Sequence, residues 1–74
     1  MVLTDLKQGQ SATIQNISSL DQVVKKRLTD FGFHVGSKIQ YKRSMPFGGP
    51  FVIETKGQSI AIRKKDAGKI EVNL

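Results

Sequence analysis

Five short segments of the chain alternate apolar and polar residues, which is the pattern of β-strands with one buried face. In the first segment, residues 11–17, Ala12 and Ile14 share one face, and Thr13 and Gln15 share the other. The later segments are 37–43, 51–56, 59–65 and 70–74. The residues that share one face in them are Ile39, Tyr41 and Arg43, then Phe51, Ile53 and Thr55, then Ile60 and Ile62, and finally Ile70, Val72 and Leu74. The pattern predicts five half-buried strands.

Residues 17–32 have the period of an amphipathic helix instead. The apolar stripe consists of Leu20, Val24, Leu28 and Phe31. Ser19 and Gln22 have the spacing of a capping box, and Asp21 suits the positive end of the helix dipole. Gly32 suits the left-handed position that ends a helix. We therefore expect one helix of about three turns after the first strand, stabilised by tertiary packing.

The predicted connections are short, with one exception. Residues 4–9 and 66–69 read as single turns, and Gly57-Gln58 as a tight hairpin turn, because glycine adopts a positive φ without a Cβ penalty. The exception is RSMPFGGPF, residues 43–51. Five short strands at this spacing favour a mainly β fold, a small barrel or sandwich, because closure removes unpaired edges.

Composition narrows the classes of function. The chain has 74 residues, no cysteine, and twelve Lys or Arg against six Asp or Glu, which gives a net charge of +6. A single domain of this length, residues 1–74, has a small core, so we do not expect an enclosed catalytic pocket. No signal peptide or membrane span is expected either, because no apolar run approaches about 20 residues. The positive charge fits solubility alone or an anionic partner.

Candidate chemical groups are few and scattered. The single histidine, His34, has no second histidine or cysteine as a partner, whereas zinc sites use about three or four protein ligands. We therefore expect His34 to be a surface or turn residue. The carboxylates do not cluster along the chain; they are Asp5, Asp21, Asp30, Glu54, Asp66 and Glu71. The sequence predicts no catalytic residue, no cofactor and no metal site.

The long connection allows several interpretations. Gly48-Gly49 lacks a following lysine and helix, and Pro50 removes an N–H group, so a phosphate-binding loop is rejected. Single-stranded nucleic acid binds five-stranded barrels through aromatic faces in a basic groove, but Tyr41 and Phe51 occupy inward positions, which leaves only Phe47. Phe47 is then either a lid over one barrel end or an exposed docking tip, and its exposure decides between them.

An ordered series of residues resembles the FeoA family. The series is Arg27-Leu28-x-x-Phe31-Gly32-x-x-x-Gly36, then Pro46-Phe47-Gly48-x-Pro50, then Ile60-Ala61-Ile62-Arg63 with Ala67, Ile70 and Val72. The match covers roughly residues 5–72, and its specificity lies in the order and spacing rather than in any one motif. Two positions depart from the family pattern: Val35 replaces a common proline, and Gly49 replaces a common aspartate that could act as a metal ligand.

The resemblance implies an SH3-like barrel with a helix inserted after the first strand. It also implies a cytoplasmic, non-enzymatic accessory to the FeoB membrane transporter GTPase, with contact to the membrane only through that partner. The same module is similar to the C-terminal domain of iron- and manganese-responsive repressors, whose DNA-binding domain has no counterpart in this sequence. Family members are often described as transition-metal binding.

The partner surface is expected to join the helix edge to the tip. The residues assigned to it are Lys25, Lys26, Leu28, Met45, Phe47, Gly48 and Gly49. Leu28 stays ambiguous, because it also belongs to the core stripe of the helix. The alternatives are a small basic barrel that binds single-stranded nucleic acid and a weak transition-metal sensor that uses His34 or the carboxylates. Exposed strand edges and the apolar tip permit weak self-association.

Overall fold

The computed structural model describes residues 1–44 and 46–74. Its strands are β1 (Ser11–Asn16), β2 (Lys38–Ser44), β3 (Phe51–Thr55), β4 (Gln58–Ile62) and β5 (Glu71–Asn73). Its helices are the 3₁₀ helix η1 (Leu3–Asp5), the helix α1 (Gln22–Asp30) and the single-turn helix α2 (Lys64–Ala67). The predicted five strands, with one helix after the first of them, are confirmed.

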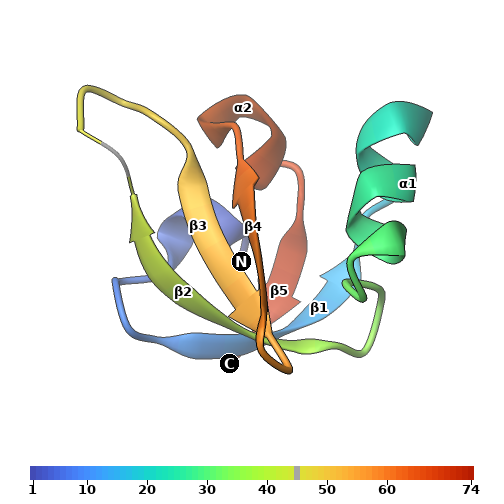
Figure 1. Cartoon of the computed structure of the whole chain (residues 1–74), viewed down its shortest axis with the longest axis horizontal. Helices are drawn as coiled ribbons and strands as arrows, with labels where there is room; N and C mark the ends of the chain where they lie inside the picture. The colour runs from blue at the N-terminus through green and yellow to red at the C-terminus, as the bar shows by residue number, and fades with distance from the viewer. Residues whose placement is uncertain (45) are drawn as a thin grey trace.

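The strands form one antiparallel sheet in the order β4-β3-β2-β1-β5. The sheet curls on itself, with α1 at one side and α2 across one end (Figure 1). Within the described residues no ladder joins β4 to β5, so the curled sheet retains two edge strands. The predicted closure that would remove unpaired edges is therefore incomplete.

The core combines one face of every strand with residues from the helices and connections. The buried apolar residues are Leu3, Leu6, Ala12, Ile14, Leu20, Leu28, Phe33, Ile39, Tyr41, Phe51, Ile53, Ile60, Ile62, Ala67, Ile70 and Val72. Thr55 is buried with them, and its hydroxyl donates a hydrogen bond of 2.8 Å to the carbonyl of Lys38. Strand alternation thus predicted most of the core correctly, because side chains on a strand point to opposite faces in turn.

Arg43 and Leu74, which the alternation of their strands predicts to point inward, are exposed. Arg43 faces solvent because the pairing register of β2 with β3 shifts between Tyr41 and Arg43, and a bulge moves the following side chains off the inner face. Leu74 is exposed because β5 ends at Asn73, one residue earlier.

The helix α1 begins and ends with backbone geometry that the sequence only partly predicts. It begins after Asp21, so the expected capping box from Ser19 is wrong, and the Asp21 side chain makes no capping hydrogen bond. At the other end Gly32 has φ +86°, which confirms the left-handed position. The chain then turns inward, and the Phe33 N–H donates to the carbonyl of Leu28 at 2.8 Å.

This turn exchanges the roles of two phenylalanines. Phe33 is 0% exposed, whereas Phe31, the predicted core residue, is 44% exposed. The helical period placed Phe31 on the buried stripe, but α1 ends at Asp30, and the left-handed Gly32 redirects the chain so that Phe33 enters the core.

The β3–β4 hairpin turns one residue earlier than expected. Thr55 pairs with Gln58, and the two turn residues are Lys56 at φ +47° and Gly57 at φ +82°. Two positive φ values in a two-residue loop define a type I′ turn, which matches the twist of the flanking strands. Gly57 occupies the second turn position rather than the first, and Gln58 already belongs to β4.

The exchanged phenylalanines generate a stability prediction. We expect Phe33→Ala to lower the free energy of unfolding by about 3–5 kcal/mol, because it empties a fully buried site. Phe31→Ala is the matched control and is expected to cost less than about 1 kcal/mol. Urea unfolding followed by circular dichroism measures both variants. Equal losses for the two would contradict the placement of Phe33 in the core.

Candidate functional site

The β2–β3 connection ends in a tight turn that projects from one end of the molecule. The Gly49 N–H donates to the carbonyl of Pro46 at 3.3 Å, and the residues between them, Phe47 and Gly48, have φ +60° and +73°. This is a β-turn with two left-handed residues. We call residues 46–50 the tip. Met45, which the sequence analysis assigns to the same surface, lies outside the described residues.

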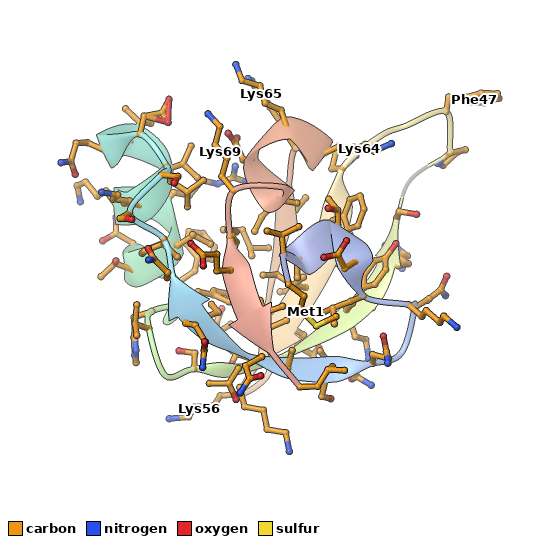
Figure 2. All side chains as sticks on the ribbon, turned by 180° about the vertical axis from the view of Figure 1, so that it is seen from behind. Met1, Phe47, Lys56, Lys64, Lys65 and Lys69 are labelled. Carbon is orange, nitrogen blue, oxygen red and sulfur yellow. The ribbon has the colours of Figure 1, made fainter. Side chains whose placement is uncertain are left out.

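Phe47 extends from this turn into solvent. Its relative exposure is 104%, and Figure 2 shows its side chain at the outer end of the loop. The interpretation of Phe47 as a lid over the barrel end is therefore wrong; Phe47 has the exposure that the docking-tip interpretation requires. A fully exposed aromatic side chain has no role in the stability of the monomer, whereas aromatic residues are enriched at the centres of interfaces.

The backbone at Phe47 is also unfavourable. A bulky residue with positive φ brings its Cβ close to the following carbonyl oxygen, at a cost of about 1–2 kcal/mol. The proline before the turn and the proline after it, Pro46 and Pro50, each restrict φ and limit the alternatives. Strained conformations of this kind are concentrated at functional sites, so the tip is a candidate contact point.

Two core aromatic residues near the ends of this connection stack on each other. The ring centroids of Tyr41 and Phe51 are 5.0 Å apart, with 19° between the ring planes, and both residues belong to the core. Their faces are therefore occupied by protein contacts and do not offer a stacking platform for bases. Of the three aromatic residues considered for nucleic acid, only Phe47 is exposed.

The helix residues assigned to the partner surface separate into different environments. Lys25 is half-buried, and Lys26 forms an exposed ion pair with Asp30, with Nζ and Oδ2 3.0 Å apart. Leu28 is 1% exposed, so its side chain belongs to the core. The structure resolves the ambiguity at Leu28 in favour of packing, and a direct contact through its side chain is not available.

The tip and α1 lie at opposite sides of the same end of the molecule, with α2 between them (Figure 1). Lys64 and Lys65 on α2 emerge at this end together with Phe47 (Figure 2). The sequence shows these lysines as a charge cluster, but only the fold places them at the same end of the molecule as the tip. They extend the basic character of the surface from α1 toward Phe47.

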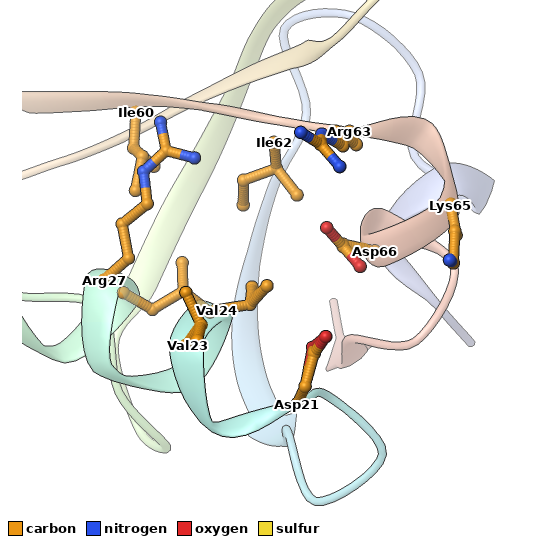
Figure 3. Close-up of a pocket in the computed structure, with 10 residues that line it drawn as sticks. Asp21, Val23, Val24, Arg27, Ile60, Ile62, Arg63, Lys65 and Asp66 are labelled. Carbon is orange, nitrogen blue, oxygen red and sulfur yellow. The ribbon is translucent and has the colours of Figure 1, made fainter.

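A groove of about 380 Å³ separates α1 from β4 and α2 (Figure 3). Its apolar lining comes from Val23, Val24, Leu28, Ile60 and Ile62. Charged residues of both signs surround the lining: Asp21, Arg27, Arg63, Lys65 and Asp66. Sequence reasoning missed this groove, because its walls come from segments that are far apart in the chain.

His34 and the carboxylates do not form a cluster in the described part of the chain. His34 is exposed in the turn after α1, as predicted, and its Nδ1 lies 3.3 Å from the Val35 carbonyl and from Ser37 Oγ. Across residues 1–44 and 46–74, no three His, Cys, Asp or Glu side chains come close enough to hold a metal ion. None of the helices in this part of the chain has the length and apolarity that a membrane crossing requires.

The molecule is thus a small, mainly β domain with an exposed aromatic tip and a basic end. The chain belongs to the FeoA family, because the family model for the FeoA domain matches residues 1–74. Proteins of this family are accessories to ferrous iron transport.

Two relatives support the assignment. A candidate Fe(2+) transport protein A of Campylobacter jejuni is 32% identical over 74 residues, which cover 100% of this chain and 99% of that protein. A fusion of Fe(2+) transport protein A with the Fe(2+) transporter FeoB in Porphyromonas gingivalis is 31% identical over 74 residues. The match to the fusion covers 100% of this chain and 9% of the fusion protein.

Two solved structures share the fold. The solution structure of the FeoA protein of Chlorobium tepidum aligns with a TM-score of 0.93 at 30% identity, covering 100% of this chain and 70% of that one. The crystal structure of Stenotrophomonas maltophilia FeoA, a zinc complex described as a prokaryotic SH3 domain protein, aligns with a TM-score of 0.73 at 26% identity. That alignment covers 99% of this chain and 89% of the other. The predicted SH3-like fold is confirmed.

The zinc in the Stenotrophomonas maltophilia structure raises the question of whether this chain has a donor set for zinc. His34 is engaged within its own turn, and Asp21 and Asp66 share the groove with Arg27, Arg63 and Lys65. Nearby cations disfavour the binding of another positive ion. The described residues of this chain therefore do not fit a resident zinc site.

The exposed tip generates a prediction about stability. We expect Phe47→Ala to change the free energy of unfolding by no more than about 0.5 kcal/mol, because the side chain makes no contact in the monomer. Phe51→Ala at the base of the tip is the control and is expected to cost about 3–5 kcal/mol. Thermal melts of both variants test the contrast, and a large loss for Phe47→Ala would mean that the tip packs against the domain.

Proposed function

We propose that this protein binds the cytosolic part of a FeoB-type transporter GTPase and modulates its activity, with the tip as the principal contact. The observation that carries the proposal is the fully exposed Phe47 on a strained turn, in a domain with few other candidates for function. The Porphyromonas gingivalis fusion supports the choice of partner, because there the same module is covalently joined to FeoB.

The tip suits an anchoring role for a physical reason. A phenylalanine inserted into a pocket of the partner removes apolar surface from water, and such aromatic anchors contribute much of the binding free energy of interfaces. Pro46 and Pro50 each fix one φ angle of the tip before binding. Less conformational entropy is then lost when the complex forms.

The basic residues at the same end contribute mainly to the rate of association. Lys25, Lys26, Lys64 and Lys65 carry like charges, and the chain has a net charge of +6. Such a surface attracts an acidic partner over a distance of about a Debye length, near 8–10 Å at moderate salt. Charges at the rim of an interface affect encounter and salt dependence more than the lifetime of the complex.

This function places the protein in the cytoplasm, at the membrane only through its partner. The Stenotrophomonas maltophilia FeoA is described as a candidate ferrous iron transport activating factor, which is consistent with modulation of the transporter. The adaptor acts by contact and needs no catalytic group of its own.

Binding to the detergent-solubilised transporter tests the proposal. With this protein immobilised, we expect Phe47→Ala to weaken binding by at least about tenfold, chiefly through faster dissociation. Lys25→Glu and Lys64→Glu are expected to slow association, with an effect that shrinks as salt rises. Association and dissociation rates measured by biolayer interferometry separate the two contributions.

The matched control is Lys56→Glu, which makes the same charge change at the opposite end of the molecule (Figure 2). We expect this variant to retain more of the association rate than Lys25→Glu. Unchanged binding by the Phe47→Ala variant, with its fold confirmed by circular dichroism, would remove the tip from the interface. No binding by the wild-type protein would end the proposal.

A further inference from the structure

The two edge strands of the sheet, β5 and β4, differ in whether another segment hydrogen-bonds to their outer edge. The outer edge of β5 is covered by the start of the chain: the Leu3 N–H donates to the carbonyl of Ile70, and the Val72 N–H donates to the carbonyl of Met1, each at 2.9 Å. No corresponding segment within the described residues hydrogen-bonds to the outer edge of β4. An open edge of this kind is a template for a further strand.

The register shows which backbone groups are free. Thr55 and Gln58 close the two-residue turn, so this pair exchanges backbone hydrogen bonds, and alternate residues of β4 do the same. Ser59 and Ala61 then direct their N–H and C=O groups away from β3. In the described part of the chain, neither residue has a backbone hydrogen bond outside the ladder.

The edge also lacks the features that usually prevent pairing. β4 has the sequence QSIAI, without proline or charge, and its pairing with β3 runs from Thr55–Gln58 to Phe51–Ile62 without a bulge. Natural edge strands are commonly protected by lysine, proline, a bulge or a covering segment. A strand left this open is suited to pairing.

The groove lies directly beside this edge. Ile60 and Ile62 of β4 form one wall, and Val24 of α1 forms the opposite one (Figure 3). Side chains alternate along a strand, so a strand added at β4 would direct every second side chain toward these apolar residues. The intervening side chains would face the charged rim, where Arg27, Arg63 and Lys65 have no ion pair within 4.0 Å among the described residues.

We propose that the free edge of β4 takes an extended, acidic segment of a partner protein as a sixth strand, with alternate apolar side chains in the groove. Backbone pairing supplies affinity in this mode, and the groove supplies specificity. The site is separate from the tip, so it stands whether or not Phe47 contacts the transporter.

Charge distinguishes this occupant from a second copy of the chain. Each copy carries a net charge of +6, and pairing two copies through β4 would bring two such charges together. The rim of the groove has three cationic and two acidic residues, and Lys64 follows directly after Arg63. A segment with acidic side chains at alternate positions therefore complements the edge better than the edge complements itself.

The test is an NMR titration of the intact protein with a blocked synthetic peptide of roughly seven alternating glutamate and valine residues, long enough to span β4. We expect saturable shifts of the Ser59 and Ala61 amide signals and slower hydrogen exchange at both. The same peptide methylated on its backbone nitrogens is expected to lose binding by at least about tenfold, because it cannot donate to the edge.

A pair of substitutions in the protein, rather than in the peptide, tests the role of the β4 edge. Ala61→Pro removes one outward N–H group while leaving the β3 ladder bonded, and is expected to weaken peptide binding about tenfold. Ala61→Val keeps that N–H group and is expected to bind as the wild type does, as is Phe47→Ala.

Three results would overturn the proposal. They are the failure of the unmethylated peptide to bind, equal binding of the methylated peptide, and dimerisation through β4 in analytical ultracentrifugation without peptide. Because the methylated peptide leaves the protein unchanged, the conclusion does not depend on the folding of Ala61→Pro. Loss of transporter binding in Phe47→Ala with intact peptide binding would show that the two surfaces act separately.

Discussion

The burial of one face of a curled five-stranded sheet is the interaction on which the rest of the structure depends. In this chain of 74 residues, the buried apolar side chains of the strands are joined, among the described residues, by seven from helices and connections: Leu3, Leu6, Leu20, Leu28, Phe33, Ala67 and Ile70. Small domains bury a modest fraction of their surface, so little apolar surface remains for an internal cavity. Function is therefore concentrated in what projects from the sheet and in what the sheet leaves unpaired.

The tip illustrates how such a core supports an exposed, strained feature. The stack of Tyr41 on Phe51 belongs to the core, yet it also closes the base of the connection that carries Phe47. The pairing of Ser44 with Phe51 fixes the two ends of the loop, and the turn between them holds Phe47 at a positive φ.

The local pattern predicts much of the fold. Period-2 alternation identifies the five strands, and the helical period identifies α1, because each strand or helix must bury one face. The errors occur where the period ends: at Arg43 after a bulge, at Phe31 beyond the last turn of α1, and at the hairpin, where Lys56 rather than Gln58 is a turn residue. At these points a bulge, a left-handed glycine or a two-residue turn changes the direction of the chain, and the local pattern no longer applies.

The sequence by itself determined the five strands, the helix, the basic character and the family. The tertiary structure alone decided that Phe47 is exposed, that Leu28 is buried, and that Lys64 and Lys65 join the tip at one end. It also decided that the N-terminal residues cover β5 while β4 stays open beside a groove. The physical reason is that periodicity reports which side of a strand or helix is apolar, whereas exposure and free edges depend on which distant segments the folded chain brings together.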